Sequence, residues 1–198
     1  MQVPILETPR LILRPIVQED VPAVQKYFGC WEIIQYIGAT VPWPYPPDGA
    51  QHWFDNIIGP EIKKGTTWVW GLVLKAEPFE VIGVIHLRSE PPSGQSDAWA
   101  QDMESHRGFW LGVPFQGQGL MTEAVAAVND WVFGTLGWEK MIVKNAAGNE
   151  ASRRVKVKTG AHFLRMEPGK YLSGITESEV WEVRREDWLA VREKEKQA

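Results

Sequence analysis

The stretch from Arg107 to Ala127 reads RGFWLGVPFQGQGLMTEAVAA, and it decides the fold of the chain. A strand-like run, Phe109 to Val113, is followed by a break that holds Gly117 and Gly119, and then by helix formers that continue to Phe133. A helix that begins after such a turn presents free backbone N–H groups and partial positive charge at its N-terminus. Because glycine has no Cβ, the turn can approach a phosphate closely. The stretch therefore predicts a phosphate site.

The spacing of this stretch excludes the two commonest phosphate motifs. A Walker loop needs G-x-x-x-x-G-K-[ST], and no lysine or hydroxyl residue stands at that place. The dinucleotide fingerprint G-x-G-x-x-G needs a third glycine where the chain has Thr122. That fingerprint also belongs early in a βαβ unit, whereas these glycines lie in the second half of the chain.

The loop sequence QGQGLM, Gln116 to Met121, resembles the [R/Q]-x-x-G-x-[G/A] loop of the GNAT superfamily of acyl-CoA-dependent N-acyltransferases. Its flanks, GFWLG and MTEA, are similar to the RimJ/RimL branch, the acetyltransferases of ribosomal-protein N-termini and their relatives. The resemblance extends to an N-x-x-S helix start at Asn149–Ser152, a K-x-G-F-like close at Lys158–Phe163 and a first strand at Thr8–Pro15. Met121 departs from the pattern, because the loop usually has glycine or alanine there.

The order of elements favours a single mixed α/β (α+β) domain over residues 1–198. Strands come first as a hairpin, Thr67–Leu74 with Val81–Arg88, and later alternate with helices. We expect about seven strands. The resemblance implies a GNAT-like mixed sheet with helices on both faces, in which the central pair, Phe109–Val113 and Lys140–Lys144, splays apart.

The resemblance also implies acetyl-CoA as cosubstrate. Its pyrophosphate would take backbone N–H groups from Gln118 to Thr122, and its pantetheine arm would pair with the edge of Trp110 to Val113. Met121 must then point away from the ligand or narrow the site. Asn149 would bond the pantetheine or cap its helix, and Arg154 is a further candidate phosphate contact. The expected cofactor-binding residues are Leu111, Gly112, Val113, Gln116, Gly117, Gln118, Gly119, Leu120, Met121, Thr122, Asn149, Ser152 and Arg153.

Direct attack of an amine on the thioester in a ternary complex requires a base for the amine and an acid for the leaving thiolate. His86, near the end of its strand, is one candidate base, and a structural role on the sheet face is its alternative. Glu104 and His106, just before the central strand, are others, with solvated loop residues as the alternative. A water chain is the third option. The resemblance makes Ser152 the candidate acid, against a simple helix-start role, and implies no metal.

Two loops are candidates for contact with the acceptor. Trp43–Tyr45, in a proline-rich segment, would wall the acceptor site unless it only packs on the core. The long polar segment Ser89–His106 is a functional loop or a surface excursion, and the sequence does not choose between them.

Composition bounds the partners and the location. A net charge of −4 gives no basic surface for nucleic acid, and no run is apolar enough to cross a bilayer. The single cysteine, Cys30, and a start without signal-peptide features lead us to expect a cytoplasmic protein. The resemblance implies an amine acceptor, a protein N-terminus or a small molecule, and is compatible with a homodimer. A non-catalytic acyl-CoA-binding or partner-binding module on the same fold is the alternative to an enzyme.

Overall fold

The computed structural model describes residues 2–78, 80–89 and 105–197, and within them the chain forms one mixed sheet of eight strands. The spatial order is β1-β2-β3-β4-β5-β6-β8-β7, and every neighbouring pair is antiparallel except β5 and β6, which are parallel. The strands are β1 (Leu6–Glu7), β2 (Leu11–Pro15), β3 (Thr67–Leu74), β4 (Val81–Arg88), β5 (Arg107–Leu111), β6 (Lys140–Ala146), β7 (Ala161–Pro168) and β8 (Glu177–Arg184). The mixed α/β prediction is confirmed, and the strand beyond the expected seven is the two-residue β1.

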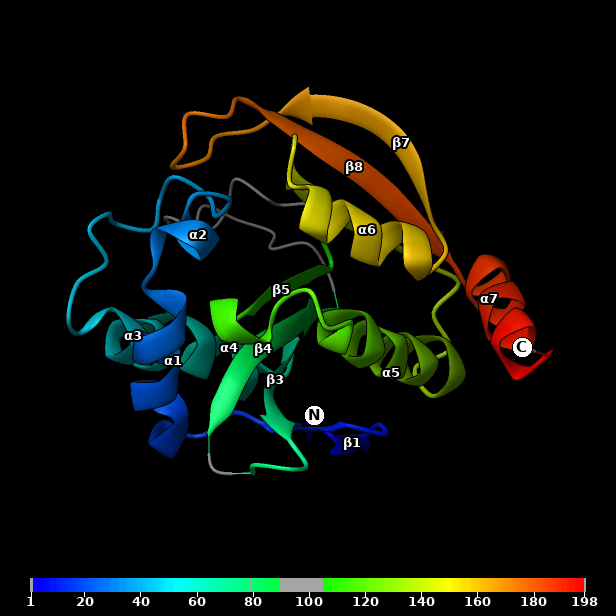
Figure 1. The fold of residues 1–198 in the computed structure, drawn as a ribbon, viewed down its shortest axis with the longest axis horizontal. Helices are drawn as coiled ribbons and strands as arrows, with labels where there is room; N and C mark the ends of the chain where they lie inside the picture. The colour runs from blue at the N-terminus through cyan, green and yellow to red at the C-terminus, as the bar shows by residue number, and fades with distance from the viewer. Residues whose placement is uncertain (1, 79, 90–104, 198) are drawn as a thin grey trace.

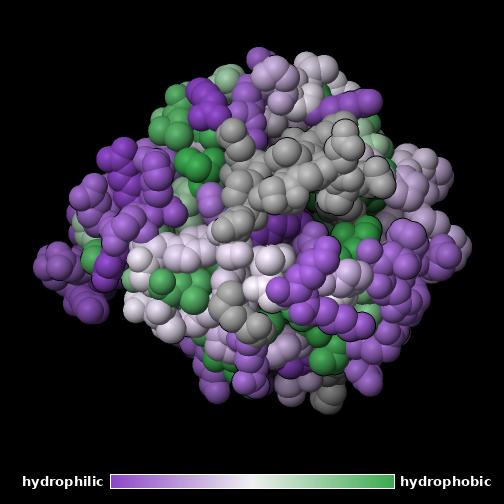
Figure 2. Space-filling view, turned by 180° about the vertical axis from the view of Figure 1, so that it is seen from behind, coloured by the Kyte–Doolittle hydropathy of each residue, from purple (hydrophilic) through white to green (hydrophobic). Residues whose placement is uncertain are grey.

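Helices cover both faces of the sheet, as Figure 1 shows with α1, α3 and α4 on one side of the central strands and α5 on the other. Figure 2 shows the molecule from behind, where hydrophilic residues cover the projecting C-terminal helix. No described helix is long and apolar enough to cross a membrane. The helical segments are η1 (Gln18–Asp20), α1 (Val21–Phe28), α2 (Trp31–Ile34), α3 (Gly49–His52), η2 (Trp53–Ile58), α4 (Gly59–Lys64), η4 (Val113–Phe115), α5 (Leu120–Gly134), α6 (Glu150–Lys158) and α7 (Arg185–Gln197).

The alternation of β3 builds a separate core on each face of the sheet. Trp68 and Trp70 point to the α5 face, where each ring meets Trp131 edge-on at centroid distances of 5.2 and 5.4 Å. Val69 and Val73 point to the opposite face and pack with α1. Several of the abundant tryptophans are therefore core residues, since a strand sends successive side chains to opposite faces.

Local geometry sets the bounds of three elements. The helical stretch after Asp48 runs without a break from Gly49 to Lys64 as α3, η2 and α4, of which η2 is π-helical, and Asp48 makes no capping side-chain hydrogen bond. The central strand ends at Leu111, because Pro114 lies in the short 3₁₀ turn η4, where a strand cannot continue. Helix α5 begins at Leu120, directly after the glycine turn.

The central strands β5 and β6 part soon after they meet. Arg107 pairs with Val143, and the His106 N–H donates to the Ile142 carbonyl at 2.8 Å. No other pair joins the two strands within the described residues. The predicted splay is therefore present, and it leaves one edge of β5 without a partner strand.

Candidate active site

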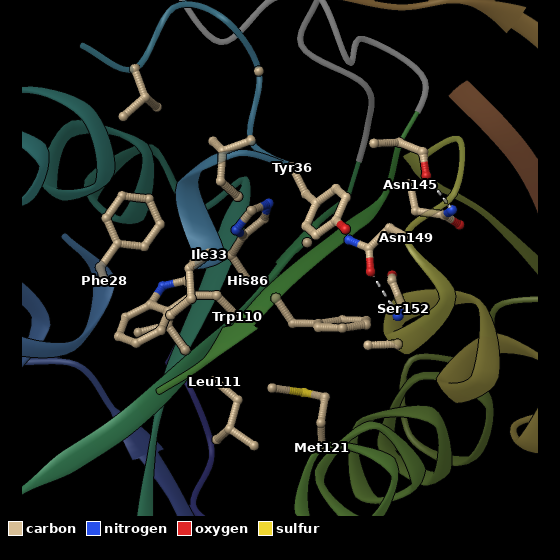
Figure 3. Close-up of a pocket in the computed structure, with 18 of the residues that line it drawn as sticks. Phe28, Ile33, Tyr36, His86, Trp110, Leu111, Met121, Asn145, Asn149 and Ser152 are labelled. Atoms are coloured by element: carbon tan, nitrogen blue, oxygen red, sulfur yellow. Dashed lines mark hydrogen bonds between the residues drawn. The ribbon is translucent and has the colours of Figure 1, made fainter. Parts of the chain in front are cut away.

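A cavity of about 730 Å³ is lined from both sides of the splayed strands. One half, called here the glycine-loop half, is formed by residues 116–122 and by residues 144–158 at the end of β6 and in α6. The other, called here the aromatic half, is formed by residues 24–58 together with β4 and β5. Figure 3 shows Asn149 and Ser152 on the first half, Phe28 and Ile33 on the second, and His86 between them. The two halves thus face each other across one continuous cavity.

The start of α5 presents unbonded N–H groups to the glycine-loop half. Gly117 and Gly119 have φ values of 77° and 79°, the left-handed region that favours glycine. Gly119 occupies the N-cap position and has no side chain to cap the helix. The first N–H that donates to a helical carbonyl is that of Glu123, at 3.0 Å from the Gly119 oxygen. The N–H groups of residues 120–122 are therefore available to an anion, as at other helix N-termini.

An acidic residue in this first helical turn is turned away from the anion site. The Glu123 carboxylate accepts hydrogen bonds from the Arg10 backbone at 2.8 Å, from Arg10 Nε at 2.7 Å and from the Thr8 hydroxyl. Burial would raise the pKa of Glu123, but these hydrogen bonds outweigh it and lower the pKa below its ordinary value. Arg10 also donates to the Gln118 carbonyl at 3.0 Å, so the start of the chain holds the glycine loop in place.

The free edge of β5 lies beside this anion site. Gly112 donates to the Ile82 carbonyl at 2.8 Å, and His106 accepts from the Arg88 N–H at 2.8 Å, so even-numbered residues of β5 bond to β4. Antiparallel pairing alternates, which turns the backbone groups of Phe109 and Leu111 toward the splayed side. The Leu111 carbonyl accepts a 2.8 Å hydrogen bond from the Gln116 side chain. An extended polar ligand can add to this edge as a strand would.

Most predicted site residues line the cavity, and a few do not. Met121 lines it, so its side chain narrows the site instead of pointing away. Arg153 lies off the cavity and pairs with Glu150 at 3.5 Å, whereas Arg154 lines it. The lining set comprises His86, Leu111, Gln116, Gly117, Gly119, Leu120, Met121, Thr122, Asn149 and Ser152. Gly112, Val113, Gln118 and Arg153 are outside that lining, and Glu104 lies outside the described residues.

The first turn of α6 places a serine and a lysine together. The Asn149 side chain accepts from the Ser152 N–H at 3.1 Å, which confirms its N-cap role. The Ser152 hydroxyl accepts from Lys156 Nζ at 2.8 Å. Lys156 is only 1% exposed, and its ammonium lies 5.6 Å from the centre of the Phe109 ring. The spacing of four residues puts Ser152 and Lys156 on one helix face, a signal that was present in the sequence.

His86 faces the cavity as a neutral imidazole. Burial lowers the pKa of His86 well below its ordinary value of 6.5, and the positive charge of Arg88 lowers it further. Arg88 Nη1 lies 3.0 Å from His86 Nε2. Because a guanidinium only donates, Nε2 accepts and the ring proton lies on Nδ1. This contact occupies the lone pair that a general base would use.

The place of the His86 ring depends on a glycine in the next strand. His86 pairs with Gly108 across β4 and β5, and a Cβ built on Gly108 would come within 2.6 Å of His86 Nε2. His106 takes a different position: its Nδ1 accepts from the Ile142 N–H at 3.1 Å, and its ring packs on Trp138. Burial lowers the pKa of His106, partly offset by the hydrogen bond with the Ile142 backbone. His106 does not line the cavity.

Three cavity residues were not anticipated from the sequence, and a fourth, Trp110, was expected only through its backbone edge. Tyr36 points toward Asn149 in Figure 3, and the Trp110 side chain lines the aromatic half. Asn145 donates to Glu179 at 3.2 Å, while its buried Oδ1 has no partner among the described residues. Arg107 is 2% exposed and donates to Asn129, and burial lowers its pKa to about 10. Each was hidden because strand and helix patterns mark burial without distinguishing a core from a cavity wall.

Of the two loops predicted near the acceptor, the proline-rich one divides between the cavity and the surface, and most of Ser89–His106 lies outside the described residues. Tyr45, from the proline-rich loop, lines the cavity, whereas Trp43 is 44% exposed and packs on Trp31 at a centroid distance of 5.1 Å. The backbone of residues 37–39 pairs with the loop between β7 and β8, where the Ala39 N–H donates to Lys170 at 2.9 Å. The described residues contain no group of three or more His, Cys, Asp or Glu side chains placed to hold a metal ion.

Fold and site together define the class of the protein. The chain belongs to the acetyltransferase (GNAT) domain family, whose family model matches residues 10–162. The family resemblance that the glycine loop predicted is thus confirmed. A comparison with curated proteins gives no match.

Solved structures share this fold at low sequence identity. The ribosomal-protein-S5-alanine acetyltransferase of Vibrio fischeri is 19% identical, with 93% of this chain and 98% of that chain covered and a TM-score of 0.70. RimL, a ribosomal L7/L12 alpha-N-protein acetyltransferase in complex with coenzyme A, is 18% identical over 91% and 98% of the two chains, with a TM-score of 0.70. Mycobacterium smegmatis RimJ in complex with CoA-disulfide is 16% identical over 96% and 94%, with a TM-score of 0.72.

Proposed function

We propose that the chain transfers an acetyl group from acetyl-CoA to a primary amine by direct attack in a ternary complex. One observation carries the proposal: the uncapped N-terminus of α5 opens beside the free edge of β5, in a cavity with room for a second molecule. Membership of the GNAT family and the coenzyme A in the RimL complex support the choice of cosubstrate.

The residues present fit acetyl-CoA. Backbone N–H groups of residues 120–122 would take the pyrophosphate, with Gly117 and Gly119 keeping the approach free of side chains. The backbone of Phe109 and Leu111 would pair with the pantetheine amides. Arg154 and Lys158 line the same half and supply positive charge for a phosphate.

The acid role falls to Ser152 with Lys156 behind it. As the amine nitrogen bonds to the acetyl carbon and the carbon–sulfur bond breaks, Ser152 would give its proton to the leaving thiolate, and the nitrogen would release its extra proton to water in the cavity. Lys156 Nζ, 2.8 Å from the hydroxyl, would return a proton to Ser152 and regain one from that water, through Ser152, once the products leave. A free N–H at the end of β5, near Leu111 or Val113, would polarise the acetyl carbonyl.

The cavity itself would promote loss of the proton from the acceptor ammonium. Its described lining holds six Arg or Lys residues, Arg88, Arg107, Lys144, Arg154, Lys158 and Lys170, against two carboxylates, Glu32 and Asp48. Burial and nearby positive charge both lower the pKa of an ammonium. We therefore propose that water accepts the proton of the acceptor ammonium. His86 stays a neutral neighbour, because burial and the positive charge of Arg88 oppose its protonation. Glu104 stays a candidate base by sequence alone.

A non-catalytic acyl-CoA-binding or partner-binding module is the second candidate. It is favoured by the engaged lone pair of His86, which leaves no ready base at that position. Both candidates require CoA binding, and only turnover separates them. A cytoplasmic location and a homodimer stay predictions.

Gly119→Asp tests the glycine-loop assignment. Aspartate tolerates the left-handed conformation better than most residues and is a good N-cap, so the fold should persist. Its carboxylate would occupy the free N–H groups and repel a phosphate. We expect CoA affinity by calorimetry to fall at least tenfold, about 1.4 kcal/mol. Gly137→Asp is the matched control, since Gly137 has φ 69° and open space around it. Equal CoA affinity in both variants would remove the loop from the site.

A further inference from the structure

We infer that the acceptor carries a bulky apolar group next to its primary amine. The inference rests on the proposed function and names the substrate class for the aromatic half of the cavity. Its walls are Phe28, Ile33, Val41, Tyr45, Trp53 and Trp110. A ligand that fills this apolar half binds more tightly, because each buried methylene contributes roughly 0.8 kcal/mol to the binding free energy.

The aromatic wall is held rigidly by its neighbours. Phe28 meets Tyr45 edge-on at 5.2 Å and Trp110 at 5.4 Å between ring centroids. Tyr45 lies against two glycines: a Cβ on Gly29 would approach its ring to 2.9 Å, and one on Gly49 to 2.6 Å. Burial raises the pKa of Tyr45 to about 12, so its phenol stays uncharged. A rigid and uncharged wall favours apolar ligands of one complementary shape, because it does not rearrange to fit others.

The charges around the described part of the cavity favour a singly charged acceptor over a polycation. The only carboxylates among the described lining residues, Glu32 and Asp48, are both on exposed residues. Arg88 faces the aromatic half with His86 bonded to one nitrogen and Glu61 3.5 Å from another. A polyamine would need several desolvated anions here, whereas the two carboxylates are on exposed residues and Arg88 adds a positive charge. One neutral amine on an apolar body fits both the wall and the charge.

This chemistry has two sources, a free arylalkylamine and the N-terminal residue of a polypeptide. The exposed pair Trp31 and Trp43, which are 40% and 44% exposed, adjoins the lining residues Glu32 and Pro42 in sequence. These rings offer apolar surface to the chain that would follow an N-terminal residue. Trp43→Ala therefore separates the sources, since Trp43 lies outside the cavity lining and could contact only the chain beyond the N-terminal residue.

The test compares four acceptors at saturating acetyl-CoA: phenethylamine, a peptide that starts with Phe, the same peptide starting with Ser, and spermidine. We expect kcat/KM at least tenfold higher for phenethylamine or the Phe peptide than for the other two. If the natural acceptor is a polypeptide, Trp43→Ala should lower kcat/KM for the Phe peptide and leave kcat/KM for phenethylamine unchanged. If the variant and the parent have equal kcat/KM for the Phe peptide, the natural acceptor is a free amine. Spermidine or the Ser peptide matching the apolar acceptors would overturn the inference.

A pocket variant and a binding measurement keep the inference separate from the proposed function. Ile37→Glu places a carboxylate in the aromatic half, and Leu189→Glu, on exposed α7, is the matched control. The pocket variant should lose at least tenfold in kcat/KM for phenethylamine and gain for spermidine. If no acceptor turns over while CoA binds, the proposed function fails. The inference is then tested by the thermal unfolding midpoint of the protein with each amine. A larger rise of the midpoint with phenethylamine than with spermidine upholds the inference, and the reverse overturns it.

Discussion

At the scale of single residues, hydrogen-bond partners decide what the candidate catalytic side chains can do. His86 and Ser152, the candidate base and acid predicted from the sequence, both line the cavity. The sequence could not show that Arg88 occupies the imidazole lone pair or that Lys156 supports the serine. Those contacts depend on side-chain directions, which a spacing pattern does not determine.

His86→Gln tests the role of the imidazole. Glutamine can still accept from Arg88, so the network should survive. If water takes the proton, the variant keeps the rise of kcat/KM with pH, which then reports the acceptor ammonium. Loss of that rise in the initial-rate profile would instead identify His86 as the base.

The lowered pKa of His86 also has a consequence for stability. A histidine with a depressed folded pKa binds fewer protons than the unfolded chain below pH 6.5, so it contributes a loss of stability as pH falls from 6.5 toward the folded value. His86→Gln should flatten part of the decrease in unfolding free energy over that range, measured by urea denaturation. An unchanged decrease would contradict the burial of a neutral imidazole. The pKa of His106 is also lowered, so part of the pH-dependent decrease in unfolding free energy should remain in the His86→Gln variant.

Ser152→Ala and Lys156→Met test the proton relay to the leaving thiolate. Each should lower kcat by about a hundredfold with CoA affinity retained, because a general acid typically contributes that much. The double variant should be no worse than either single one, since the pair acts as a unit. If the two single decreases in kcat multiply in the double variant, the relay is contradicted. An unchanged rate in Ser152→Ala would leave Ser152 as a helix-start residue.

At the scale of elements, periodic patterns predicted the long strands and helices well. The strands Thr67–Leu74 and Val81–Arg88 were predicted with the bounds that the structure has. The two-residue β1 and the π-helical η2 were missed, because neither has a pattern of its own. The end of β5 was placed two residues late, since the 3₁₀ turn at Pro114 follows from local geometry.

The junction of β5 with α5 contains a buried charge whose cost can be measured. Arg107 donates to Asn129, while its Nε and Nη2 have no partner among the described residues. Asn129→Leu should lower the unfolding free energy by about 2 kcal/mol, because it strands the guanidinium. Arg107→Met combined with Asn129→Leu should restore or exceed the parent stability by roughly 1 kcal/mol, as apolar replacements of buried charges often do. A double variant less stable than the single one in denaturant unfolding would contradict this account.

At the scale of the whole molecule, the cavity has a charge balance opposite to that of the chain. The net charge is −4, yet cations outnumber carboxylates around the described part of the cavity. The order of elements predicted the mixed α/β fold, which the sheet confirms, but gave no hint of this charge separation, because the separation arises from residues far apart in sequence. The acceptor pocket was likewise beyond prediction, since residues 24–58 meet β4 and β5 only in the folded chain.

The most direct test of acetyl transfer is the initial rate of free-thiol release from acetyl-CoA, varied against phenethylamine and the Phe peptide. The account predicts release only when both substrates are present, with one acetylated amine for each thiol. Double-reciprocal lines should intersect, as a ternary complex requires; parallel lines would indicate a covalent acetyl-enzyme and contradict direct attack. Bound CoA without thiol release for any acceptor in the panel would contradict the enzyme itself and leave the binding module.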